Sequence, residues 1–283
     1  MKILVLGASG MLGNAMLRVM SEKEGWSIFG TVRGAYPALH AAAPRAVLIS
    51  GVHADQPDSL LAAFAQARPD VVINCVGLVK QLSSAEDPLV AVPINTMLPH
   101  RLARMCEVAG ARLVHVSTDC VFSGKQGNYT ESNLADARDV YGRSKLLGEV
   151  DYPHAVTLRT SIIGHELRSA HGLIDWFLSQ QARVKGYTEA VFSGLPTCEL
   201  ARVVRDFVIP LASLSGVYHV AAEPISKHDL LKIVNREYGK NLQIDPNDQV
   251  KINRSLDASL FREATGYVAP AWPDLIAQMR EFR

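Results

Sequence analysis

The chain begins MKILVLGASGMLG (residues 1–13), and this stretch decides the fold. Its apolar run KILVL (2–6) is typical of a buried strand, and three glycines follow where that strand would turn into a helix. Glycines permit a tight turn close to a pyrophosphate, and a helix N-terminus offers free N–H groups. An ordinary strand–helix turn is the alternative, so the rest of the chain must decide. The residues expected to contact a dinucleotide here are Gly7, Gly10, Met11, Leu12 and Gly13.

The first 160 residues alternate short apolar runs with longer amphipathic segments, which is typical of βαβ units. Right-handed connections between such units predict an α/β fold of the Rossmann type, a doubly wound parallel sheet with ligands beyond the carboxyl ends of its strands. The expected strands are 2–6, 26–32, 46–50, 70–76, 112–117 and 154–159. The expected helices are 11–21, 58–66, 95–109 and 141–150.

After about residue 160 the alternation weakens. We therefore expect a dinucleotide-binding domain over 1–160 and a smaller C-terminal α/β substrate-binding lobe over 161–283. The strand-like GVYHV (216–220) would belong to this lobe or return to the main sheet. The helices expected in this part are 173–182, 197–212, 226–237, 256–264 and 272–281.

Composition favours a small-molecule partner. Lys and Arg number 29 against 28 Asp and Glu, with no long run of like charge, so neither nucleic acid nor an anionic membrane is an expected partner. No apolar segment reaches the length of a membrane span or a signal-peptide core. The four cysteines and nine histidines lack disulfide or metal-ligand spacing, so no metal is expected and a reducing cytoplasm is the expected location.

The second expected strand runs into GTVRG (30–34), which bears on the choice of cofactor. An acidic residue at this place favours the free 2′-hydroxyl of NADH, whereas an arginine accommodates the 2′-phosphate of NADPH. Arg33 therefore favours NADPH, and NADH stays open because Arg33 could equally be a solvated surface side chain. Near the end of the third strand, His53 or Asp55 is a candidate neighbour of the adenine.

The stretch YGRSK (141–145) places a phenol and an ammonium four residues apart. On a helix this spacing puts Tyr141 and Lys145 on one face, one turn apart. A neighbouring cation lowers the pKa of a phenol from its ordinary value of about 10 and makes it a usable acid. A packed tyrosine beside a solvated lysine is the alternative for the spacing alone.

GASGMLG (7–13), STDCVFSG (117–124) and YGRSK in this order resemble the extended short-chain dehydrogenase/reductases. Within them, they resemble the dTDP-4-dehydrorhamnose reductase type of nucleotide-sugar reductase. The similarity continues through LRTS (158–161) and SGLPT (193–197) to RSLDASLF (254–261).

The resemblance implies a catalytic set of Thr118, Tyr141 and Lys145. Tyr141 would protonate the oxygen of a sugar C4 ketone that receives hydride, and Thr118 would hydrogen-bond the same oxygen. Lys145 would lower the pKa of Tyr141 and hold the nicotinamide ribose. The residues that follow the family by position are Cys75, Val76 and Gly77 beside the cofactor, Asp119 toward the sugar, and Thr160 and Ser161 near the nicotinamide. For these, ordinary strand-end packing is the alternative.

The implied function is NADPH-dependent reduction of a nucleotide-linked 4-keto-6-deoxy sugar for surface polysaccharides, with a homodimer left open. Cys120 stands where related 4,6-dehydratases carry an acid, which argues against elimination of water. The reductases usually have tyrosine there, so the sugar contacts stay open. Two alternatives remain: a cofactor-binding regulatory subunit without turnover, like that of methionine adenosyltransferase, and a nucleotide-sugar epimerase.

Overall fold

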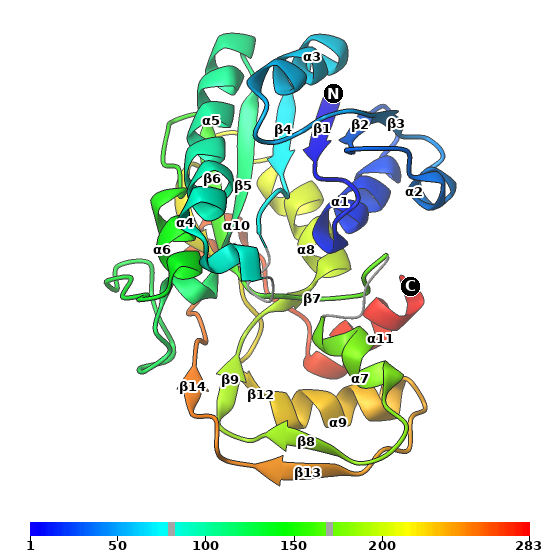
Figure 1. The fold of residues 1–283 in the computed structure, drawn as a ribbon, viewed down its shortest axis with the longest axis vertical. Coiled ribbons are helices and arrows are strands. Elements are labelled where there is room, and N and C mark those ends of the chain that lie inside the picture. Colours follow the sequence, from blue (N-terminus) through cyan, green and yellow to red (C-terminus); the bar gives the residue numbers. More distant parts are fainter. Residues whose placement is uncertain (79–82, 168–171) are drawn as a thin grey trace.

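The computed structural model describes residues 1–78, 83–167 and 172–283, and its centre is a parallel seven-stranded sheet (Figure 1). The strand order is β11-β6-β5-β4-β1-β2-β3. The bounds of these strands are β1 (Lys2–Leu6), β2 (Ser27–Thr31), β3 (Val47–Ile49), β4 (Val71–Asn74), β5 (Arg112–Thr118), β6 (Ala155–Thr160) and β11 (Gly216–His219).

The sheet is buried on both faces, which explains the unbroken apolar runs of its strands. In β1, Ile3 and Val5 join one core cluster while Leu4 and Leu6 join the other. One cluster includes side chains of α1 (Met11–Ser21), α8 (Thr197–Val203) and α11 (Trp272–Glu281). The other includes those of α3 (Pro57–Ala67) and α5 (Leu98–Ala109). The expected doubly wound α/β fold is confirmed.

The direction of winding reverses between β1 and β4. After β1 the chain runs outward through β2 to β3, and it then returns to place β4 on the other side of β1. The loops after β1 and β4 therefore leave in opposite directions and open a crevice at the carboxyl edge of the sheet.

Several helices differ from the expected bounds for identifiable reasons. The helix expected over 95–109 begins earlier, as α4 (Pro88–Ala91), and reaches α5 through a π turn, η2 (Val92–Met97). Pro93 has no N–H, so the regular hydrogen-bond ladder is interrupted there. The helix expected over 197–212 similarly leaves α8 for a second π turn, η4 (Val204–Val208).

The helix α6 (Val140–Leu147) ends three residues before the expected position 150. A Cβ at Gly148, the residue after it, would lie 1.9 Å from the Asn95 carbonyl oxygen, so the chain passes η2 in close contact. The remaining short helices of this half are α2 (Pro37–Ala42), η1 (Ser83–Glu86) and η3 (Asp119–Val121).

The second half of the chain builds a lobe below the carboxyl edge of the main sheet (Figure 1). Its strands form three small sheets: β7 (Ile162–Ile163) with β10 (Leu195–Pro196), β8 (Val184–Tyr187) with β13 (Ile244–Asn247), and β9 (Ala190–Phe192) between β12 (Ile225–Ser226) and β14 (Ile252–Asn253). Its helices are α7 (Leu173–Ser179) and α9 (Lys227–Glu237), whereas α10 (Ser259–Thr265) lies beside β11 of the main sheet. Between these elements the chain returns to the main sheet, where β11 pairs with β6.

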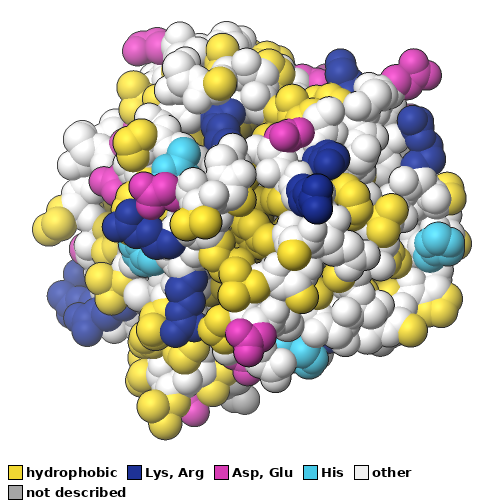
Figure 2. All heavy atoms as spheres, turned by 90° about the horizontal axis from the view of Figure 1, so that it is seen from above, with side chains coloured by type: hydrophobic (Ala, Val, Ile, Leu, Met, Phe, Trp, Pro, Cys, Tyr) yellow, Lys and Arg dark blue, Asp and Glu magenta, His cyan; other side chains and the backbone are white. Residues whose placement is uncertain are grey.

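The surface carries no strong field of one sign on the face seen in Figure 2, where acidic and basic side chains are interspersed among uncharged and apolar ones. This agrees with the formal net charge of +1. Within the three described ranges, no helix combines the length and the apolar character that crossing a bilayer requires.

Candidate active site

The turn after β1 depends on its three glycines. Gly7 has a φ of +75°, a conformation that other residues adopt at a cost, and its carbonyl accepts a hydrogen bond from the Gly10 N–H at 3.0 Å. A Cβ at Gly13 would lie 2.1 Å from that same carbonyl oxygen, so α1 can start this close to β1 only with glycine there. The Gly7 N–H donates to Thr31 Oγ1 at 3.1 Å, which ties the turn to the end of β2.

A cleft of about 830 Å³ opens at this turn, between the carboxyl edge of the sheet and the lobe. Of the residues expected at the cofactor or substrate, it is lined by Gly10, Met11, Leu12, Arg33, Cys75, Val76, Gly77, Thr118, Asp119, Tyr141, Lys145, Thr160 and Ser161. Gly7 and Gly13 do not line the cleft, but they allow the tight turn that forms part of it. His53 and Asp55 are not among the described residues that line the cleft.

The start of α6 brings Tyr141 beside the end of β5. Asp139 caps the helix, since its carboxylate accepts a hydrogen bond from the Gly142 N–H at 2.7 Å. A Cβ at Gly142 would lie 2.4 Å from the Cys120 carbonyl oxygen, so this glycine allows the helix to touch the chain after β5. Tyr141 and Thr118 are close enough for a side-chain hydrogen bond.

The pKa of Tyr141 is raised above the ordinary value of a phenol. Burial is the largest cause, the nearby Cys120 and Asp119 act in the same direction, and the hydrogen bond with Thr118 opposes them. Lys145 is not among the described groups that shift this pKa. The expectation that Lys145 lowers it is therefore wrong for this structure, and the Tyr141 hydroxyl stays protonated at neutral pH.

The reason is the position of the Lys145 ammonium, which donates a hydrogen bond to the Val116 carbonyl oxygen at 2.8 Å. Tyr141 and Lys145 do share one helix, but the lysine side chain lies toward the ends of β4 and β5, where a Cβ at Gly77 would be 3.8 Å from its Nζ. Burial lowers the pKa of Lys145 to about 8, although the charges of Glu149 and Cys75 act to raise it.

The other expected residues that line the cleft differ in exposure and charge. Arg33 is exposed just after the end of β2 and lines the same cleft as the glycine turn. Burial raises the pKa of the Cys75 thiol to about 12, so the thiol stays protonated at neutral pH. The pKa of Asp119 is raised by burial, against the charges of Arg254 and Lys227 from the lobe. Cys120 is half-buried and lines the cleft.

Buried polar residues outside the lining of the cleft hold this arrangement together, and no sequence motif predicted them. Asn95 is fully buried on η2; its Oδ1 accepts from the Leu78 N–H at 3.1 Å and its Nδ2 donates to Ser144 Oγ at 3.1 Å, which joins the loop after β4 to α6. Glu149 accepts hydrogen bonds from Ser117 Oγ at 2.7 Å and from Arg159. These partners lie far apart in sequence, so no local pattern marks them.

Within residues 1–78, 83–167 and 172–283, no group of three or more His, Cys, Asp or Glu side chains is placed to hold an ion. The lobe contributes Lys227 and Arg254 to the cleft wall instead, and sequence position alone gave no sign that these two cations face the end of β5.

The chain is similar in sequence to known proteins of two kinds. The dTDP-4-dehydrorhamnose reductase of Streptomyces griseus is 33% identical over 147 residues, 52% of this chain and 43% of that protein. Methionine adenosyltransferase 2 subunit beta of Danio rerio is 24% identical over 251 residues, 81% of this chain and 71% of that protein. The chain spans about half the length of the curated dTDP-4-dehydrorhamnose reductases that it matches.

A solved structure shows the same fold over the whole length. The dTDP-4-dehydrorhamnose reductase of Bacillus anthracis, in complex with NADP, superposes with a TM-score of 0.78 at 17% identity and with all of both chains covered. The family resemblance read from the three motifs is confirmed by a match of residues 1–274 to the family described as RmlD substrate binding domain. Since this match covers nearly all of the 283 residues, the chain belongs to the RmlD substrate binding domain family.

Proposed function

We propose that this chain is an NADPH-dependent reductase of a nucleotide-linked 4-keto-6-deoxy sugar. The observation that carries the proposal is the meeting of Tyr141, Thr118 and Lys145 in one cleft with the glycine turn after β1. The relatives named dTDP-4-dehydrorhamnose reductase support the substrate class.

The cleft fits a dinucleotide. The glycine turn presents backbone N–H groups at the start of α1 and leaves no Cβ in the way, as a pyrophosphate requires. Arg33 on the same wall would meet a 2′-phosphate, which supports NADPH over NADH, and the NADP bound to the Bacillus anthracis reductase agrees. When bound, the reduced nicotinamide supplies a hydride. Lys145, beside Gly77, would hold the nicotinamide ribose.

The proton comes from the chain's own residues. A reductase needs a proton donor at the carbonyl oxygen, and the Tyr141 hydroxyl, beside Thr118 in the cleft, is the candidate donor. Thr118 would orient that hydroxyl and donate to the same oxygen as negative charge develops. The protonated Lys145 adds positive charge to this end of the cleft.

The lobe would recognise the nucleotide sugar. Lys227 and Arg254 place two positive charges on the wall opposite the glycine turn, and a diphosphate is the anionic part of a nucleotide sugar. Asp119 lines the same cleft and feels the charges of both cations, and its carboxylate would accept a hydrogen bond from a sugar hydroxyl. We accordingly assign cofactor binding mainly to residues 1–160 and substrate binding to 161–283.

We further infer a place in the supply of deoxysugars for polysaccharides, in the cytoplasm, because NADPH and nucleotide sugars are made there. We also propose that the chain forms a homodimer in solution. Sedimentation of the purified protein at micromolar concentration tests it: a single species at the mass of the monomer, 30.8 kDa, would exclude the dimer.

The direct test is a screen of nucleotide-linked 4-ketosugars, each with NADPH and with NADH, followed by the loss of reduced-cofactor absorbance. We expect net oxidation of NADPH with at least one ketosugar, and slower oxidation of NADH. An epimerase would return its hydride and show no net loss. No oxidation with any ketosugar would exclude the reductase.

A second candidate is a cofactor-binding regulatory subunit, which the similarity to methionine adenosyltransferase 2 subunit beta supports. A regulatory subunit has no need of a proton donor, so the Tyr141 and Thr118 arrangement favours the reductase. Stable co-purification with a methionine adenosyltransferase, together with no ketosugar reduction, would favour the second candidate.

A further inference from the structure

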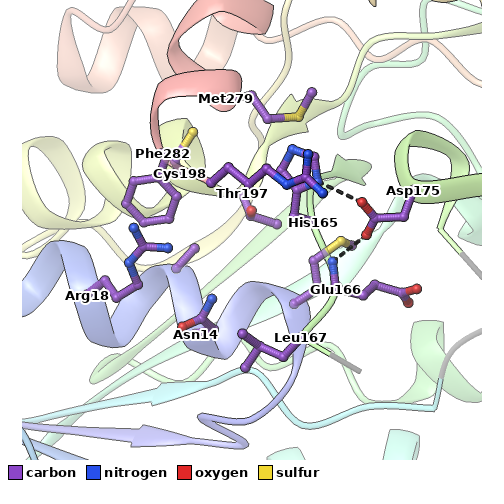
Figure 3. Close-up of a pocket in the computed structure, with 13 residues that line it drawn as sticks. Asn14, Arg18, His165, Glu166, Leu167, Asp175, Thr197, Cys198, Met279 and Phe282 are labelled. Carbon is purple, nitrogen blue, oxygen red and sulfur yellow. Dashed lines mark hydrogen bonds and ion pairs between the residues drawn. The ribbon is translucent and has the colours of Figure 1, made fainter. Parts of the chain in front are cut away.

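A second cavity, of about 200 Å³, lies beside α1 and adjoins the main cleft (Figure 3). Its walls come from α1, the start of α8, the chain after β7 and the end of α11. Met11, Glu166 and Leu167 line both spaces. The cavity is far too small for a dinucleotide or a nucleotide sugar, so any ligand must be a small molecule.

Arg18 brings a positive charge to this cavity. Its guanidinium stacks on the Phe282 ring, with Cζ 3.8 Å from the ring centroid. It donates no hydrogen bond to any residue in the described part of the chain. Burial lowers its pKa, although the group remains a cation at neutral pH. An anion with planar oxygens would satisfy donors that otherwise reach only solvent.

Asn14 lies one turn before Arg18 on the same face of α1, and both side chains rise into the same space in Figure 3. Asn14 is only 6% exposed, yet its Oδ1 is buried and accepts no hydrogen bond within the described ranges. A buried amide oxygen without a partner is costly. A ligand that reached it from beside the guanidinium would supply the missing hydrogen bond.

The opposite wall does not compete for Arg18. His165 is engaged at both ring nitrogens, with Asp175 Oδ1 at 2.7 Å from Nδ1 and the Tyr238 hydroxyl at 2.8 Å from Nε2. The second oxygen of Asp175 accepts from the Glu166 N–H at 2.6 Å. This carboxylate is thus held by its own neighbours (Figure 3), and the guanidinium is left facing the cavity.

We propose that this cavity binds a small hydroxycarboxylate of three or four carbons. The carboxylate pairs with the Arg18 guanidinium, and a hydroxyl group exchanges hydrogen bonds with the Asn14 amide. The volume admits a ligand of this size, and the amide, which can both donate and accept, suits a hydroxyl. This site does not depend on the reductase function, since it uses none of the residues assigned to hydride or proton transfer.

Calorimetric titration of the purified full chain with glycerate, propionate and glycerol tests the proposal. Glycerate carries both groups, propionate lacks the hydroxyls and glycerol lacks the charge. We expect millimolar binding of glycerate, binding of propionate weaker by about tenfold, and no detectable binding of glycerol. Equal binding of glycerate and propionate, or no binding of glycerate, would overturn the proposal.

Two variants locate the site. Arg18→Met keeps the packing on Phe282 and removes the charge, so glycerate affinity should fall by at least about tenfold. Arg104→Met is the matched control, because Arg104 also stacks on a ring, that of Tyr152, but lies on α5. An equal loss in both variants would refute the assignment. If Arg18→Met does not fold, the ligand series on the unmodified protein still decides.

Competition distinguishes this cavity from the main cleft. Saturating NADP⁺ should leave glycerate binding in place, whereas displacement of glycerate by NADP⁺ would put it in the cleft and overturn the proposal. If the chain bound no NADP⁺ at all, the reductase proposal would fail while the Arg18→Met comparison would still test this site.

Discussion

At the scale of single residues, the protonated hydroxyl of Tyr141 is the group on which the proposed reduction depends. Tyr141→Phe removes the proton donor and little else, so we expect kcat to fall by about 10²–10⁴-fold while NADPH affinity changes less than about twofold. Tyr152→Phe is the control, because that hydroxyl pairs with His100 away from the cleft. The measurement is steady-state NADPH oxidation, and full activity in Tyr141→Phe would contradict the assignment.

Lys145 gives the reaction its expected upper pH limit. Its pKa of about 8 lies below the ordinary 10.5, so the ammonium loses its proton, and with it its charge, as pH rises through about 8. We expect kcat/KM to be flat below that pH and to fall about tenfold per pH unit above it. In Lys145→Arg, which keeps its charge, the decline should move to higher pH. A profile of wild type that stays flat to pH 10 would exclude the role.

At the scale of elements, the turn from β1 into α1 is so tight that adding a single methyl group should disturb the cofactor site. Gly13→Ala places a Cβ 2.1 Å from the Gly7 carbonyl oxygen, so the turn must open and NADPH affinity should fall by at least about tenfold, with a lower melting temperature. Gly34→Ala also adds a Cβ to the cleft wall, but this Cβ would meet nothing within 4 Å. The NADPH affinity and the melting temperature of this variant should therefore stay unchanged. Equal NADPH affinities in the two variants would disprove this account of the turn.

Most elements of the first half were predictable because strands such as β1 and helices such as α1 are long enough to show their period, whereas the short helix α2 was missed. The strands of the lobe were missed, since they have only two to four residues and pair locally. Pro246 lies within β13, opposite Gly186 of β8, where an edge strand tolerates a missing N–H. The π turns at η2 and η4 likewise leave no periodic trace in the sequence.

The candidate site was predictable only where its residues are local in sequence. The glycine triad and the spacing of Tyr141 and Lys145 revealed two parts of the cleft. The spacing could not show that the Lys145 ammonium turns to the Val116 carbonyl, nor that Asn95 reaches Ser144 across 49 residues. The electrostatics of the site are therefore a product of the tertiary structure, and the raised pKa of Tyr141 is an example.

At the scale of the whole molecule, a buried ion pair fixes β5, β6 and the end of α6 around the cleft. Arg159 Nη2 lies 2.7 Å from Glu149 Oε2, with both side chains less than a tenth exposed. Glu149→Gln leaves the Arg159 charge buried without its partner, and we expect the free energy of unfolding to fall by about 3–5 kcal/mol.

Denaturant unfolding of the matched pair measures this. Glu107→Gln breaks the exposed pair with Arg104 and should change the free energy of unfolding by less than about 1 kcal/mol. Similar values for the two variants would show that the buried pair does not stabilise the molecule.

The central claim is that the chain transfers hydride to a sugar carbonyl, and isotope transfer tests it most directly. A nucleotide-linked 4-ketosugar is reacted with NADPH deuterated at the transferable position of the nicotinamide, and the sugar product is analysed by mass spectrometry. We predict one deuterium at C4 of the sugar, formed at a rate that Tyr141→Phe suppresses. Unchanged ketosugar, or a product without deuterium, would contradict the account.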